Sequence, residues 1–141
     1  MAKRRKARHY ALQALYQWHM AGASTRDIDA EFRSDYDFSV VDRDYFKALL
    51  DGVVDDVEAL DALYEPLLDR KLSELDPIER SLLRMGSFEL RERIDVPYRV
   101  VINEAVSLAK KFGAAESFRY INGVLDKLAQ QLRGPEVSAA S

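Results

Sequence analysis

The sequence contains no cysteine, which excludes disulfide bonds and metal sites built on thiolates. Only 6 glycines and 4 prolines occur among 141 residues, so we expect few tight turns and few long loops. Charged residues interrupt every apolar stretch well before the roughly 18 residues that a membrane-spanning helix needs. The basic N-terminus is followed by an amphipathic pattern, so we expect no secretory signal. These absences favour a soluble protein of a reducing compartment, the cytoplasm.

Motifs that carry catalysis or bind cofactors are also absent from the sequence. It has no glycine-rich phosphate loop, no nucleophile elbow and no His-x-x-x-His pair. The only two histidines, His9 and His19, fall on one predicted helix. The helical rise separates them by about 15 Å, which is too far to bind one metal ion. We therefore expect no catalytic residue, no metal and no cofactor, and we favour a protein that acts by binding.

Charge is distributed unevenly along the chain, although the net charge is only −3. Residues 11–141 hold 16 basic and 24 acidic side chains, a local charge of −8. An acidic body with a concentrated basic arm is typical of proteins that bind a polyanion over a small area. A solvated start of a helix has the same composition, so both interpretations stay open on charge alone. The first ten residues contain five basic side chains and no acidic one: Lys3, Arg4, Arg5, Lys6 and Arg8.

Apolar residues recur at helical spacing, and no long stretch alternates with a period of two. The pattern predicts an all-α fold, a compact seven-helix bundle that divides into two small helical subbundles near residue 70. We expect one domain over residues 1–133, followed by a frayed tail at 134–141 that begins at Gly134-Pro135. The predicted helices cover residues 5–20, 24–32, 42–54, 57–68, 76–91, 95–112 and 116–132.

Several local signals predict where these helices begin and end. Gly22 is placed to end the first helix, while Ser24 and Asp42 are suited to cap the next two. Pro66 should end or kink the fourth helix. The strongest start signal is Asp76-Pro77-Ile78-Glu79, which combines a capping acid, a proline at the first helical position and a glutamate three residues after the cap.

A second candidate surface surrounds the turn between the last two long helices. It combines basic and aromatic side chains close to a predicted helix N-terminus, where free N–H groups attract anions and an exposed ring can stack an unpaired base. Phe118 and Tyr120 could instead be core residues. The apolar stripe of the last helix leaves room for at most one of them, and Tyr120 is the better candidate for stacking. The residues concerned are Lys110, Lys111, Phe118, Arg119 and Tyr120.

Three blocks of sequence carry a recognisable pattern: RRKARHYALQALYQW at Arg4–Trp18, LDPIERSLLRMGSFEL at Leu75–Leu90 and VPYRVVINEAVSLAKKFGAAESFRYINGVLDKLAQQLR at Val96–Arg133. In this order they resemble the NusB family of bacterial transcription antitermination factors. Only Gly22–Val41 and the tail add nothing to the resemblance. It implies an all-helical fold of two subbundles and a role in reading through terminators, chiefly in ribosomal RNA operons. The implied partners are NusE (a small-subunit ribosomal protein), single-stranded boxA RNA and a modified RNA polymerase.

The resemblance also implies roles for individual residues. The positions that face NusE are Tyr16, Trp18 and Glu79, although Glu79 could serve only the capping box. Some relatives carry aspartate in place of Glu116, and some carry phenylalanine in place of Tyr120. Glutamate is a poorer N-cap than aspartate, whereas tyrosine can still stack. The positions that match the family's RNA surface are the basic arm (Lys3, Arg4, Arg5, Lys6, Arg8) together with Lys110, Glu116, Ser117, Arg119 and Tyr120.

Two alternatives come from other classes of protein. A NusB-like helical domain also precedes the catalytic domain of some RNA cytosine methyltransferases, but the 141 residues leave no room for that domain. A longer gene would revive this alternative. Some NusB-like proteins self-associate, so a homodimer that buries the RNA surface is the second alternative.

Overall fold

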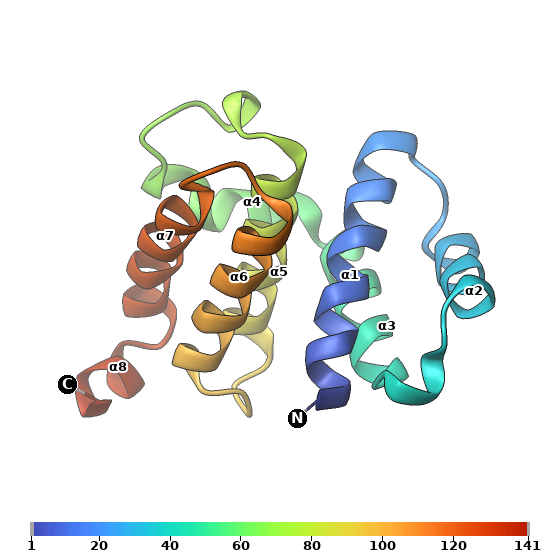
Figure 1. Ribbon diagram of the computed structural model, residues 1–141. Helices are drawn as coiled ribbons and strands as arrows, with labels where there is room; N and C mark the ends of the chain where they lie inside the picture. Colours follow the sequence, from blue (N-terminus) through green and yellow to red (C-terminus); the bar gives the residue numbers. More distant parts are fainter. Residues whose placement is uncertain (1, 141) are drawn as a thin grey trace. The chain divides into compact units, whose positions relative to one another are not determined.

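The computed structural model describes residues 2–140, which contain eight α-helices and three short 3-10 helices and no strand (Figure 1). The all-α prediction is confirmed, whereas the predicted number of seven helices is too low by one. The first three helices are α1 (Ala2–Ala21), α2 (Thr25–Asp35) and α3 (Arg43–Asp55). The others are α4 (Val57–Tyr64), α5 (Pro77–Glu92), α6 (Tyr98–Phe112), α7 (Ser117–Leu132) and α8 (Gly134–Ala140). The 3-10 helices are η1 (Phe38–Val40), η2 (Glu65–Leu67) and η3 (Leu72–Glu74).

The chain divides into two compact units, Met1–Asp56 and Val57–Ser141. The boundary lies earlier than the predicted division near residue 70, because α4 packs with α5 inside the second unit. A buried ion pair connects these two helices: the Arg84 guanidinium donates to both carboxylate oxygens of Asp61 at 2.9 Å. Tyr64 donates to the same carboxylate at 2.6 Å, so the charge of Asp61 is satisfied within the interior.

In the first unit α1 packs against α2 and α3, and the predicted local signals are confirmed. Gly22 follows α1 with a φ of 72°, a left-handed conformation that favours glycine, and its N–H donates to the Trp18 carbonyl at 2.9 Å. The Ser24 hydroxyl accepts from the Asp27 N–H at 3.1 Å, and the Asp42 carboxylate accepts from the Tyr45 N–H at 3.0 Å. Both side chains therefore cap the helices that they precede.

In the second unit α5 packs against α4, α6 and α7, and every residue from 81 to 90 is buried. The predicted capping box at its start is confirmed: Asp76 accepts from the Glu79 N–H at 2.8 Å, and Glu79 accepts from the Asp76 N–H at 3.3 Å. Gly86 allows α5 and α7 to approach closely, since a Cβ there would lie 2.8 Å from Leu125. Pro66 falls in η2 directly after α4, so the prediction that it ends that helix is confirmed.

The predicted frayed tail is wrong for residues 134–140, which form α8. The Glu136 carboxylate accepts from the Tyr98 N–H at 2.8 Å and thereby satisfies the start of α6. The same carboxylate accepts from Arg133 at 2.8 Å. No side chain next to Tyr98 caps α6, because the residue before it is Pro97. A distant glutamate thus satisfies the start of α6, which begins at Tyr98 and not at residue 95 as predicted.

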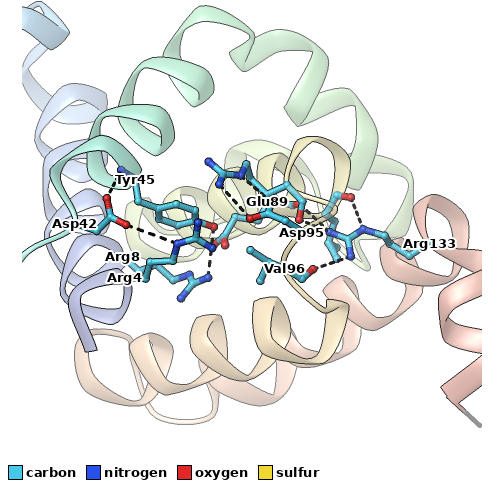
Figure 2. Close-up of polar contacts among 10 residues, drawn as sticks. Arg4, Arg8, Asp42, Tyr45, Glu89, Asp95, Val96 and Arg133 are labelled. Carbon is cyan, nitrogen blue, oxygen red and sulfur yellow. Dashed lines mark hydrogen bonds and ion pairs between the residues drawn. The ribbon is translucent and has the colours of Figure 1, made fainter. Parts of the chain in front are cut away.

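Arg133 is a buried cation that holds the chain after α5 in place (Figure 2). Its guanidinium donates to the carbonyls of Glu89 at 3.0 Å, Leu90 at 2.8 Å, Arg93 at 2.9 Å and Val96 at 2.8 Å. Glu89 and Leu90 belong to the last turn of α5, where carbonyls run short of N–H partners from the helix itself; the Glu89 carbonyl also accepts from the Arg93 N–H at 3.0 Å. Arg133, which lies between α7 and α8, therefore neutralises the negative end of α5.

Candidate nucleic-acid interface

The basic arm forms the first turns of α1 and is held in a fixed register. The Lys3 carbonyl accepts from the Asp42 N–H at 3.0 Å, which ties the start of α1 to the start of α3. Lys3, Arg5 and Lys6 are exposed. Because the helix is already formed, these three exposed cations can meet phosphates without a cost for ordering the backbone.

Arg4 and Arg8 differ from the rest of the arm, because both lie against the Tyr45 ring of α3 (Figure 2). Their guanidinium carbons lie 4.4 Å and 5.2 Å from the ring centroid, respectively. Arg4 is half-buried with its Nε 3.7 Å from the Asp42 carboxylate. Arg8 is only 5% exposed and donates to the Tyr45 hydroxyl at 3.4 Å. The structure therefore separates Arg8 from the exposed part of the arm.

The sequence carries a signal for the burial of Arg8 that charge counting overlooks. Arg8 precedes Leu12 by four residues and Leu15 by seven, so it falls on the same helix face as these two buried leucines. An arginine within an apolar stripe is more often a packing residue than a phosphate ligand.

The candidate turn runs from the end of α6 to the start of α7. Gly113 ends α6, and its N–H donates to the Ala109 carbonyl at 2.8 Å. Glu116 adopts a left-handed conformation with φ 72° and gives α7 no side-chain cap, as expected for a long side chain at this position. Its carboxylate instead forms an ion pair with Arg119, and both side chains are exposed. The charge of Arg119 is thus partly neutralised within the turn.

Two cations lie against the Phe118 ring of this turn. Lys110 Nζ lies 4.9 Å from the ring centroid and the Arg119 guanidinium carbon lies 5.3 Å from it. Phe118 is half-buried, whereas Lys110 and Arg119 are exposed. Lys111 is exposed as well. This part of the turn combines positive charge with an aromatic ring, as single-stranded nucleic-acid sites do.

Tyr120 is half-buried, and a residue that the sequence did not single out covers its ring. The Arg70 guanidinium carbon lies 4.0 Å from the Tyr120 ring centroid. Burial raises the pKa of the Tyr120 hydroxyl above its usual value, and the neighbouring Asp69 carboxylate adds to this shift. The sequence did not indicate a role for Arg70, because this residue lies between η2 and η3, where no periodic pattern predicts which side chains are buried.

Ser117 and Glu79 are joined in the interior rather than exposed at the surface. Ser117 Oγ donates to Glu79 Oε2 at 3.0 Å, and the two residues are 5% and 7% exposed. The other oxygen of Glu79 serves the capping box with Asp76. Glu79 therefore ties the start of α7 to the start of α5, a structural role that the sequence indicated only in part.

The two remaining predicted partner residues lie near the end of α1. Tyr16 is 38% exposed and Trp18 is half-buried. Met20, one turn beyond Tyr16, is 59% exposed and extends the apolar surface around it. Exposed apolar side chains clustered on one helix favour contact with a protein.

Residues 2–140, the part of the chain that the structure describes, contain no group of three or more His, Asp or Glu side chains that could hold a metal ion. Nor does any helix in that range have the length and apolar character needed to cross a membrane.

Comparison with known sequences identifies close relatives. The sequence model described as the NusB family matches residues 5–130. The transcription antitermination protein NusB of Hahella chejuensis is 63% identical over 140 residues, which cover 99% of this chain and 94% of the relative. The protein of the same name from Alcanivorax borkumensis is 59% identical over 135 residues, with 96% and 90% of the two chains covered.

Solved structures of NusB proteins with lower sequence identity have a similar fold. NusB of T. maritima superposes with a TM-score of 0.79 at 26% identity, covering 90% of each chain. A crystal structure of the antitermination factors NusB and NusE in complex with dsRNA contains a chain that superposes with a TM-score of 0.81 at 27% identity, over 93% of this chain and 98% of that one. Sequence and fold thus agree over nearly the whole chain, and the chain belongs to the NusB family.

Proposed function

We infer that this chain is a transcription antitermination factor that binds RNA together with a NusE-type partner. The observation that carries the inference is 63% identity, over 99% of the chain, to a protein named for transcription antitermination. A similar fold occurs in a complex of NusB, NusE and RNA. The protein acts by binding rather than catalysis, and it works in the cytoplasm, where bacterial RNA polymerase transcribes.

The RNA is a single strand of the boxA type, and two regions bind it. The exposed cations of the arm, Lys3, Arg5 and Lys6, contact phosphates. The turn with Lys110, Arg119 and Tyr120 supplies stacking and further charge. Glu116 shapes this turn through its left-handed backbone and its ion pair with Arg119. Ser117 and Arg8 support the two regions from inside rather than touching the RNA, as their burial favours.

The NusE-type partner binds the end of α1 through Tyr16 and Trp18. The complex of both proteins with RNA then joins a modified RNA polymerase that reads through terminators. Glu79 contributes to this surface only if its carboxylate leaves the capping box, since it is 7% exposed. Tyr16, which is 38% exposed, is therefore the stronger candidate for direct contact.

The test is binding of labelled RNA to the full chain, alone and with the cognate NusE. A boxA-like single strand, a scrambled strand of equal length and a boxA duplex are compared at fixed salt. We expect the boxA single strand to bind most tightly, and more tightly still with NusE. Equal affinity for all three RNAs would contradict the proposal.

Light scattering in the same buffers tests the alternative of a self-associating protein. A homodimer that RNA does not dissociate, and that binds no RNA, would favour that alternative instead.

A further inference from the structure

The segment between η2 and η3 contains Arg70, whose guanidinium lies against the ring of Tyr120, the candidate stacking residue. Its flanking residues Leu68 and Lys71 are extended, with ψ values of 149° and 148°, so the intervening residues project from a short open stretch of chain. η2 also packs against α7, the helix that carries Tyr120. This packing holds the segment beside the start of α7.

Arg70 covers the Tyr120 ring more closely than the other cations of the turn cover Phe118. The distance from the guanidinium carbon to the ring centroid is 4.0 Å, against 4.9 Å for Lys110 and 5.3 Å for Arg119 over Phe118. A guanidinium at this distance is in van der Waals contact with the ring. The outer surface at this point is therefore arginine rather than tyrosine.

The Arg70 guanidinium is also fixed along one edge. Its Nε lies 2.8 Å from a carboxylate oxygen of Asp69, and the two side chains are 37% and 68% exposed. One face of the plane is occupied by Tyr120 and one edge by Asp69, so the exposed part comprises the opposite face and the remaining N–H groups. Such a plane can stack an unpaired base, while its free N–H groups donate to a phosphate or a base edge.

We propose that Arg70 binds RNA, and that an unpaired base stacks on its guanidinium, with Tyr120 as the layer beneath. This inference rests on the proposed function and assigns the ligand class of the platform: one unpaired nucleotide of a single-stranded RNA. Tyr120 then acts through Arg70, holding the guanidinium flat. Asp69 fixes the orientation of the Arg70 guanidinium and offsets its positive charge. The platform therefore contributes stacking energy more than electrostatic attraction to phosphates.

The test compares variants of the full chain in binding a boxA-like single strand that carries 2-aminopurine, a base whose fluorescence falls on stacking. The key variants are Arg70→Ala and Arg70→Lys, because lysine keeps the charge and removes the plane. Lys71→Ala is the matched control: it removes one exposed cation from the same segment. Thermal melting of each variant verifies that the fold is intact.

We expect Arg70→Ala to weaken binding about tenfold, within the usual range for one stacked base. Arg70→Lys should lose nearly as much affinity with an unchanged salt dependence, and both variants should restore 2-aminopurine fluorescence. Lys71→Ala should weaken binding no more than about threefold and leave the fluorescence quenched. Combining Arg70→Ala with Tyr120→Ala should cost little beyond either change alone, because the two layers act as one platform.

The inference is overturned if Arg70→Ala binds RNA as wild type does, or more tightly, since Arg70 would then be inert or a cover over the tyrosine. It is equally overturned if Arg70→Lys equals wild type, since charge alone would then suffice. A wild-type chain that binds no single-stranded RNA with or without NusE would refute the proposed function itself, which distinguishes the two failures.

Discussion

The basic arm and the turn before α7 are both rich in cations, but they hold these cations in opposite ways. In the arm, Lys3, Arg5 and Lys6 are exposed on the first turns of α1, and Asp42 of α3 pairs with Arg4. In the turn, Arg119 pairs with Glu116; beside the turn, Arg70 from the segment between η2 and η3 pairs with Asp69.

This difference predicts that the arm and the turn contribute different terms to RNA binding. Exposed cations concentrated in a run of ten residues that contains no acidic residue attract phosphates over a distance and make binding sensitive to salt. Cations that are paired and stacked on rings add little net charge, but they provide flat surfaces for bases. The arm should therefore supply most of the electrostatic affinity, whereas the turn should distinguish an unpaired base from a duplex.

The largest expected effect comes from removing charge from the arm. Replacing Lys3, Arg5 and Lys6 with alanine should weaken RNA binding on the order of 50-fold at 0.15 M salt and reduce the slope of log K against log salt by about 2, at roughly 0.7 per phosphate. Fluorescence anisotropy over a salt series measures both quantities.

The matched change in the turn is Lys110→Ala with Arg119→Ala. Because Glu116 already offsets Arg119, this pair should reduce the slope by about 1 or less. A slope change equal to that of the arm would break the proposed division between the two regions.

The next largest effect concerns stability rather than affinity. Glu79→Lys should lower the free energy of unfolding by about 2 kcal/mol, because it removes two hydrogen bonds to a buried carboxylate and puts a cation at a helix N-terminus. Glu79→Gln should cost less, since an amide oxygen can still accept one of those bonds. Melting curves measure the loss, and the arm variants should show none.

Calorimetric titration of NusE below the melting transition separates the two roles of Glu79. If Glu79 only supports the start of α7, Glu79→Lys should bind NusE normally in the cold. Loss of partner affinity in a fully folded Glu79→Lys chain would place this residue at the partner surface instead.

A smaller effect is expected at the stacking ring. Tyr120→Ala should weaken binding of the boxA-like single strand about tenfold, while Tyr120→Phe should stay near wild type because the ring remains. The salt slope should be unchanged in both, in contrast to the arm. A fall in melting temperature with intact RNA affinity would return Tyr120 to a purely structural role.

The smallest effect concerns pH. Burial raises the pKa of the Tyr120 hydroxyl above its ordinary value of 10.0, so it ionises at higher pH than a free tyrosine does. The ratio of RNA affinities of wild type and Tyr120→Phe should therefore change by less than about twofold between pH 7 and pH 9, where even a free tyrosine is mostly neutral. If the phenol ionised within that range, its negative charge would repel phosphates and the ratio would fall.

Much of the fold could be predicted because its signals are local. Gly22, Ser24, Asp42 and the capping box at Asp76 each act within four residues, so sequence spacing is sufficient to find them. α8 was missed because its stabilising bonds are long-range: Glu136 meets Tyr98 across 38 positions. The predicted boundary between the two units, near residue 70, was wrong for the same reason. The ion pair between Asp61 and Arg84 joins α4 to α5 across 23 positions, and apolar periodicity does not indicate it.

The site could be predicted by region but not by side chain. Charge density located the arm, yet the interior position of Arg8 depends on its contact with Tyr45, 37 residues away. The turn was found from its basic and aromatic composition, whereas Arg70 required knowing which segment folds over Tyr120. Residue type indicates which contacts a side chain can make, but packing decides which side chains are exposed to make them.

The dependence of α5 on Arg133 has a consequence for synthesis on the ribosome. Arg133 is added 43 residues after Leu90, whose carbonyl it holds, and 37 after Val96. Until it emerges from the exit tunnel, the end of α5 and the chain after it lack the hydrogen bonds of this guanidinium. The caps described for α2 and α3 of the first unit, Ser24 and Asp42, are local, so that unit can order earlier in translation. The second unit should therefore close only after Arg133 has emerged, and its nascent form is the one more exposed to chaperones and proteases.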